Sequence, residues 1–126
     1  MNPSQVYSVD AISDSTLDMI SSLGFDHELI RVKKQIANWI QRCDSEMRDA
    51  LEWQFLGGSK YFRPLTIFAC YRSLIPGPIP DEIITSAVVI EFFHNVTLII
   101  DDILDRSEER RGRATLLVNR AGAVAR

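Results

Sequence analysis

Apolar residues recur at helical spacing along most of the chain, with polar residues between them. The clearest apolar stripe is Leu29, Val32, Ile36 and Ile40. We expect Asp26 to cap the helix that carries this stripe. A second helix is predicted to begin at Asp44 or Ser45 and to end at Gly57-Gly58, because glycine is favoured just past a helix end.

The second half of the chain continues this pattern. Pro64 fits the first turn of a helix that reaches about Leu74, and the proline-rich segment 76–80 breaks the chain. Asp81 is expected to cap a long helix that runs to about Asp105. The polar segment 107–114 is predicted to be a loop. We expect Thr115 to cap a last helix over 116–126.

This organisation predicts an all-α fold, an antiparallel helix bundle, with a flexible arm at 1–14 and a helical unit over 15–126. Ser15 or Thr16 would cap a short first helix that ends at Gly24. No alternating strand pattern is present. The apolar helix over 83–104 needs covering on most sides, and the final helix has barely begun where the chain stops. We therefore expect a second copy or a missing C-terminal half to complete the fold.

Composition narrows the class. The chain has 126 residues, 46% hydrophobic and 25% charged, which suits one small globular domain. A net charge of −3 gives no general reason to bind nucleic acid. Cys43 and Cys70 fit reduced structural thiols, and no signal peptide is visible, so we expect a cytoplasmic protein. The apolar run 87–100 is shorter than the ~20 residues that span a bilayer, so no membrane span is expected.

The most informative stretch joins Asp101, Asp102 and Asp105 to Arg110 and Arg111. Asp101 and Asp105 would share one face of a helix, with the third carboxylate beside them. Three carboxylates at the end of an apolar helix repel one another and require a cation. Hard oxygen ligands at this spacing suit Mg²⁺, which also binds substrate phosphates, and guanidinium groups pair with phosphate oxygens. The stretch therefore predicts a diphosphate site.

A second polar cluster lies at 57–64, where two glycines precede Lys60, Arg63 and Pro64. The following helix N-terminus would favour an anion. Taken alone, the cluster fits an ordinary turn with solvated charges. Together with the aspartates and arginines it indicates a second anion site. His94 lies two turns before Asp101, on the same face. It is either a core histidine or a donor to a diphosphate oxygen.

These residues together resemble the N-terminal part of the trans-isoprenyl diphosphate synthases, or polyprenyl synthetases. The matching segments are Gly57-Gly58-Ser59-Lys60-Tyr61-Phe62-Arg63-Pro64, Glu91-Phe92-Phe93-His94, Asp101-Asp102-Ile103-Leu104-Asp105 and Arg110-Arg111-Gly112-Arg113-Ala114-Thr115. They stand in the family's order and cover roughly residues 45–126. The resemblance implies the N-terminal portion of the isoprenoid synthase fold, with helices around a deep cavity, usually in a homodimer.

The resemblance also implies an activity and roles for residues. An allylic diphosphate ionises, isopentenyl diphosphate attacks the cation, and a proton is lost. By the family pattern, Mg²⁺ and the allylic diphosphate would be held by Asp101, Asp102, Asp105 and Arg110. Isopentenyl diphosphate would be held by Lys60, Arg63, His94 and Arg111. Val96 and Thr97 take the positions that floor the product cavity, and since neither is aromatic we expect C20 or longer products. The alternative is that Val96 and Thr97 are ordinary packing residues and that residues on another helix close the cavity.

Some features depart from the family. Tyr61 stands where many members carry a basic residue, and Ala114 replaces a proline. The second aspartate-rich motif has no counterpart, so the chain carries the first half of an active site. We favour a fragment or half-enzyme completed by a partner chain. The alternative is a truncated, non-catalytic diphosphate-binding or regulatory subunit. A helical interaction module without a ligand would leave the clustered charges unexplained.

Overall fold

The structure is a computed structural model that describes residues 18, 21–55 and 60–124, with side chains described as far as 120. The predicted arm at 1–14, the proposed caps Ser15 and Thr16, and Gly57-Gly58 with Ser59 lie outside the described residues. The described elements are α3 (Asp26–Gln41), α4 (Ser45–Phe55), α5 (Phe62–Leu74), α6 (Asp81–Asp105), β1 (Glu109–Arg110), β2 (Arg113–Ala114) and α7 (Leu116–Val124).

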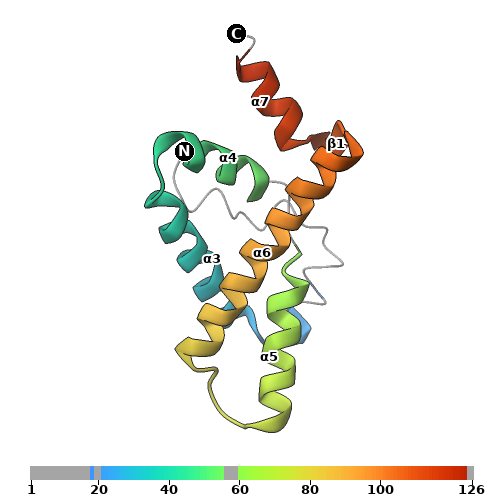
Figure 1. Cartoon of the computed structure of the whole chain (residues 1–126). Coiled ribbons are helices and arrows are strands. Elements are labelled where there is room, and N and C mark those ends of the chain that lie inside the picture. Colours follow the sequence, from blue (N-terminus) through green and yellow to red (C-terminus); the bar gives the residue numbers. More distant parts are fainter. Residues whose placement is uncertain (1–17, 19–20, 56–59, 125–126) are drawn as a thin grey trace.

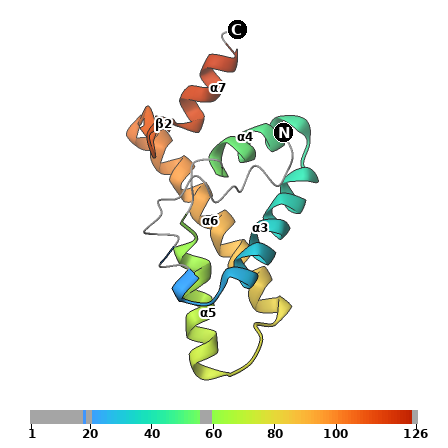
Figure 2. The same cartoon turned by 180° about the vertical axis from the view of Figure 1, so that it is seen from behind.

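The helices pack around α6. The proline-rich turn joins α5 to α6 as an antiparallel pair, and α3 packs along α6 as well (Figure 1). The short helix α4 lies across the upper part of α3 and α6, and α7 projects past the end of α6 in both views (Figure 2). The predicted all-α class is confirmed.

A single apolar core lies between α3, α5 and α6. The predicted stripe on α3 is buried and meets residues from both neighbouring helices, while Phe55 closes the core from α4. Phe25 and Phe68 pack with their ring centroids 5.9 Å apart. The largest contributions come from side chains with no more than 1% exposure: Phe68, Ile36, Ile40, Val32, Ala87 and Val88. Burial of this apolar area is the main favourable term in folding.

Two of the predicted helix caps are confirmed. The backbone N–H of Met47 donates to Asp44 Oδ1 at 2.9 Å, so Asp44 caps α4. The backbone N–H of Val118 donates to Thr115 Oγ1 at 3.5 Å at the start of α7. Each oxygen satisfies an N–H group that has no partner within the helix.

Two other predicted caps are wrong. Asp26 is the first helical residue of α3, after Phe25, and Asp81 is the first of α6, after Pro80; neither helix has a side-chain cap. Asp81 instead pairs with Arg31 of α3. Both carboxylates still lie in a first turn, where the helix dipole favours negative charge.

The predicted loop at 107–114 is also corrected, because it contains a short β-hairpin. Arg110 pairs with Arg113, and the turn residues Arg111 and Gly112 have φ values of 54° and 78°. Two consecutive residues with positive φ are typical of a type I′ turn. The strands are two residues long, too short to produce an alternating pattern, so no strand signal is visible in the sequence.

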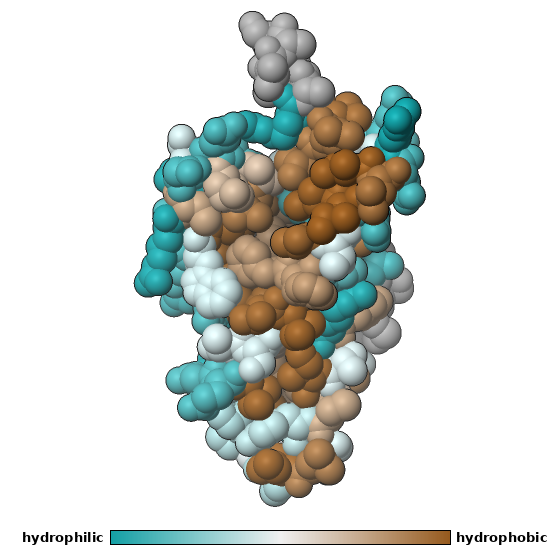
Figure 3. All heavy atoms as spheres, viewed as in Figure 1, coloured by the Kyte–Doolittle hydropathy of each residue, from teal (hydrophilic) through white to brown (hydrophobic). Residues whose placement is uncertain are grey.

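One face of α6 is apolar and exposed. Its exposed side chains follow one another at intervals of three and four residues: Val89, Phe93, Val96, Ile100 and Ile103. Apolar atoms follow the course of α6 in the space-filling view (Figure 3). The helix is longer than the apolar run considered above, and by length and composition alone it could cross a membrane. One such helix is weak grounds for a membrane assignment, since core helices of soluble proteins meet the same criteria.

The core predicts a strong effect of Phe68→Ala. Loss of a fully buried aromatic side chain removes transfer free energy and leaves a cavity, so the free energy of unfolding should fall by about 3–5 kcal/mol. Urea denaturation followed by circular dichroism measures this loss. Leu74→Ala on the same helix is the control, because Leu74 is 82% exposed, and it should change the free energy by less than about 0.5 kcal/mol. Similar losses for both variants would contradict the described core.

Candidate functional site

A hollow of about 300 Å³ opens between the start of α5, the middle of α6 and the hairpin turn. It is lined by Lys60, Tyr61, Phe62, Arg63, Glu91, His94 and Arg111. All four residues predicted to hold isopentenyl diphosphate therefore lie around one hollow, although they come from three separate segments. Three permanent cations and an imidazole at one opening favour an anionic ligand.

A left-handed residue shapes the α5 side of this hollow. Tyr61 has φ of 57° and is buried, and it immediately precedes the first helical residue of α5. Such a backbone is uncommon for a residue with a side chain. Lys33 of α3 lies over the Tyr61 ring, with its Nζ 5.3 Å from the ring centroid. Loss of hydration lowers the pKa of Lys33, and the charge of Asp26 partly opposes this.

His94 is held in a field of positive charge. Partial burial lowers the pKa of its imidazole from the ordinary 6.5, and Arg63, Arg111 and Arg110 lower it further, while Glu91 opposes them. The surrounding positive charge therefore favours the neutral imidazole when the hollow contains no anion. A bound diphosphate would reverse the sign of the local field and favour the protonated form.

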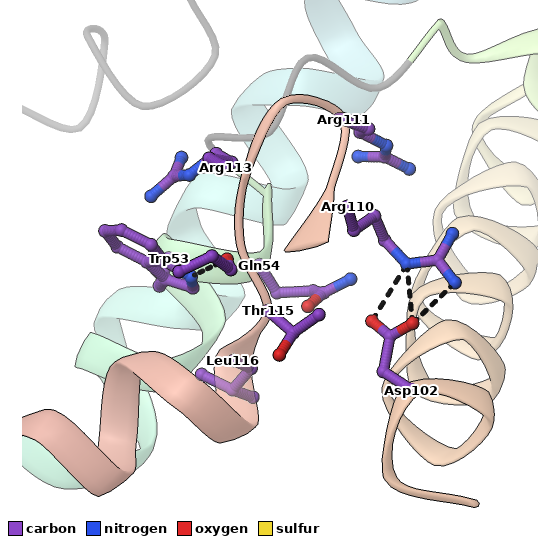
Figure 4. A pocket seen from close by; sticks show the side chains of 9 residues that line it. Trp53, Gln54, Asp102, Arg110, Arg111, Arg113, Thr115 and Leu116 are labelled. Carbon is purple, nitrogen blue, oxygen red and sulfur yellow. Dashed lines mark hydrogen bonds and ion pairs between the residues drawn. The ribbon is translucent and has the colours of Figure 1, made fainter. Parts of the chain in front are cut away.

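The three predicted metal-binding aspartates do not point to one place. Asp102 is buried and its carboxylate accepts hydrogen bonds from Arg110 Nε and Nη2 at 2.7–3.1 Å (Figure 4). This hydrogen-bonded pair raises the pKa of Arg110. Asp101 and Asp105 are exposed at the helix end. In the described part of the chain no group of three metal-ligating side chains is assembled.

The donor set nevertheless fits Mg²⁺ in part. Asp101 and Asp105 offer hard oxygen ligands one helical turn apart, and Mg²⁺ commonly takes one or two carboxylates with waters and substrate phosphates. Asp102 does not fit as a ligand in this arrangement, because Arg110 engages both of its oxygens. In the ligand-free arrangement Asp102 is the partner of Arg110, and its role as a metal ligand stays a prediction.

The end of α6 explains how Arg110 reaches Asp102. Arg106 takes a left-handed conformation, and the N–H groups of Arg106 and Ser107 donate back to Ile103 and Asp102. This is the Schellman arrangement, which terminates a helix and turns the chain. The hairpin then folds back against the last turn of α6, so Arg110 meets Asp102.

The hairpin is also anchored on α4. Trp53 Nε1–H donates to the carbonyl oxygen of Ala114 at 3.1 Å, and the Arg113 guanidinium lies 3.5 Å from the centroid of the Trp53 ring (Figure 4). Such a stacked cation is favourable. The sequence pattern assigned no role to Trp53 and placed Arg113 only within a matching segment, because nothing in the spacing of the two residues links them.

The two predicted chain-length residues lie side by side on α6 but in different surroundings. Val96 is 44% exposed and belongs to the apolar face of α6. Thr97 is half-buried, and its hydroxyl donates to the carbonyl oxygen of His94 at 2.6 Å. Val96 is therefore the better placed of the two to meet an apolar ligand.

Comparison with known proteins gives a consistent result. Residues 44–125 match the polyprenyl synthetase family. The chain is 35% identical over 107 residues to a (2E,6E)-farnesyl diphosphate synthase of Mycobacterium bovis, covering 75% of the chain and 28% of that protein. It is 37% identical over 84 residues to a nonaprenyl diphosphate synthase of Mycobacterium tuberculosis, covering 65% and 24%.

A short chain isoprenyl diphosphate synthase of Methanocaldococcus jannaschii is 28% identical over 95 residues, covering 75% of the chain and 28% of that protein. The chain thus spans about a quarter of the length of these curated relatives. No solved structure matches it significantly.

The ion pair between Asp102 and Arg110 predicts a large effect of Arg110→Ala. The substitution leaves a buried carboxylate without its partner, so the free energy of unfolding should fall by about 3 kcal/mol. Arg120→Ala is the control. Arg120 Nη2 lies 3.6 Å from Oε1 of Glu46, whose side chain is 86% exposed, and exposed ion pairs contribute about 0–1 kcal/mol to stability. Chemical denaturation at pH 7 measures both. A loss for Arg110→Ala no greater than the control's would contradict this role.

The lowered pKa of His94 predicts a pH dependence of stability. The unfolded chain binds the proton more readily than the folded chain, so stability should decline as pH falls below about 6.5. Urea unfolding of wild type and His94→Gln at pH 7.5 and 5.5 measures the difference. The loss between the two pH values should be smaller for His94→Gln. An equal or larger loss in that variant would rule out a depressed pKa at His94.

Proposed function

The chain belongs to the polyprenyl synthetase family, and from this we propose that it forms the diphosphate-binding part of a trans-prenyltransferase. That enzyme would condense isopentenyl diphosphate with an allylic diphosphate. The observation that carries the proposal is the convergence of Lys60, Arg63, His94 and Arg111 on one hollow. A diphosphate matches this hollow in charge, because its oxygens can accept from all four groups.

The hollow would hold isopentenyl diphosphate, and the allylic diphosphate would lie at the end of α6. Asp101 and Asp105 would hold Mg²⁺ there, where the metal ion supplies neutralisation of charge on the leaving diphosphate. The contacts of Arg110 with Asp102 use Nε and Nη2. Arg110 Nη1 would then donate to the allylic diphosphate as the bond between carbon and the diphosphate oxygen breaks. Preorganised donors of this kind stabilise the charge that develops.

The apolar face of α6 would accompany the hydrocarbon. A carbocation formed beside this face needs protection from water, and Phe93, Val96 and Ile100 offer apolar surface that continues from the diphosphate end of the helix. In the whole protein we propose that a second copy or a further segment covers this face and completes the site. The small side chains at Val96 and Thr97 favour products of C20 or longer; the relatives' names range from farnesyl to nonaprenyl.

The proposal predicts that two pairs of substitutions act on different ligands. Lys60→Ala and Arg63→Ala should weaken binding of isopentenyl diphosphate about tenfold or more, since each removes a charge-assisted hydrogen bond. Asp101→Ala and Asp105→Ala should instead weaken Mg²⁺-dependent binding of geranyl diphosphate. Titration calorimetry with each ligand, with and without Mg²⁺, measures the constants.

Lys34→Ala is the control, since Lys34 is exposed on α3 away from the hollow, and it should leave both affinities unchanged. Equal losses for both ligands in all four variants would contradict the assignment of two separate sites. A prenyl-transfer assay with labelled isopentenyl diphosphate on the same samples tests turnover. Binding of both ligands without turnover by the folded chain would favour the non-catalytic alternative or an incomplete site.

A further inference from the structure

Glu91 is the acidic side chain among the described residues that line the hollow. It lies on α6, one turn before His94, and only 1% of its surface is exposed. A buried carboxylate is costly unless cations or hydrogen-bond donors surround it. In this position it would also repel an incoming diphosphate, so its presence at an anion site requires an explanation.

The surroundings of Glu91 show what it acts on. Asn95 Nδ2 donates to the backbone carbonyl oxygen of Glu91 at 2.9 Å and lies 3.5 Å from Glu91 Oε1, so the amide of Asn95 is near the carboxylate. The Glu91 charge attracts the Arg111 guanidinium and favours the protonated form of His94. Loss of hydration and repulsion by Arg110 lower the pKa of Arg111, and Glu91 is the first of the charges that oppose them.

We propose that Glu91 is the internal counter-ion of the hollow: its buried carboxylate, one turn before His94 and in the same hollow as Arg111, offsets the positive charges there before an anion arrives. This inference rests on the proposed function of the hollow as a diphosphate site. When diphosphate binds, its negative charge neutralises the cations that Glu91 neutralises in the empty hollow.

The charges around His94 come from every element that packs against it. Arg63 faces it from α5, Arg110 and Arg111 from the hairpin, and Glu91 from α6 itself. Lys60 lines the same hollow. Removal of the Glu91 charge would therefore leave His94 surrounded by positive groups. Protonation of the imidazole, and the proton uptake that accompanies anion binding, would then move to lower pH.

The test is the pKa of His94 in the ligand-free chain, followed by NMR of the imidazole Cε1–H signals. The chain has two histidines, so His27 on α3 serves as an internal reference. Glu91→Gln should lower the pKa of His94 clearly below the wild-type value. Glu82→Gln, an exposed acid at the start of α6, is the matched control and should leave the pKa unchanged. An unchanged or raised pKa in a folded Glu91→Gln variant overturns the proposal.

A second variant keeps the test decisive if Glu91→Gln does not fold. Glu91→Asp retains the charge but withdraws it by one methylene, so it should lower the pKa of His94 by less than Glu91→Gln. A folded Glu91→Asp chain with the wild-type pKa and the wild-type Arg111 side-chain signals overturns the proposal.

Inorganic diphosphate, added to the same samples, separates this inference from the proposed function. A rise in the pKa of His94 on addition supports the anion site. A Glu91 effect in the free chain without any response to diphosphate supports the role of Glu91 and overturns the proposed function. A response to diphosphate without any Glu91 effect supports the proposed function and overturns the role of Glu91.

Discussion

The ion pair between Asp102 and Arg110 fixes the corner at which α6 ends and the hairpin begins. Asp102 is buried in the last turn of the helix, so its carboxylate needs a partner, and Arg110 supplies three hydrogen bonds. Because the hairpin turn follows at once, this pair also decides where Arg111 lies. The anion hollow, formed by segments on three sides, therefore depends on one contact outside it.

Helix α6 serves the core, the polar site and the apolar surface at once. Ala87 and Val88 bury against α3 and α5, Glu91 and His94 face the hollow, and Phe93 and Val96 stay exposed. Because α6 is apolar both where it meets the core and on its exposed face, apolar residues make up most of the helix. That explains why its composition resembles a membrane span although polar groups lie at defined positions on one side. The exposed face is the part of α6 that we propose a second copy or a further segment covers.

Left-handed backbone conformations occur at the junctions that shape the site. Tyr61 precedes α5, Arg106 follows α6, and Arg111 lies in the hairpin turn, each with φ between 52° and 57°. Such residues cost roughly 1–3 kcal/mol and persist where the surroundings hold them. Tyr61 is buried under Lys33, Arg106 closes the Schellman turn, and Arg111 is constrained by the paired strands. The backbone strain at these three residues therefore lies where the chain changes direction next to the candidate site.

The helices could be predicted from the amino-acid pattern, because the 3.6-residue spacing on α3, the proline-rich break and the length of α6 follow from local propensity and burial. It also named Lys60, Arg63, His94 and Arg111, since each stands in a recognisable motif. It did not reveal the hairpin, whose strands are too short to show a period, or the caps at Phe25 and Pro80. Only the tertiary structure paired Asp102 with Arg110 and placed Glu91 among the cations. Those outcomes depend on where separate segments meet, which spacing along one helix cannot specify.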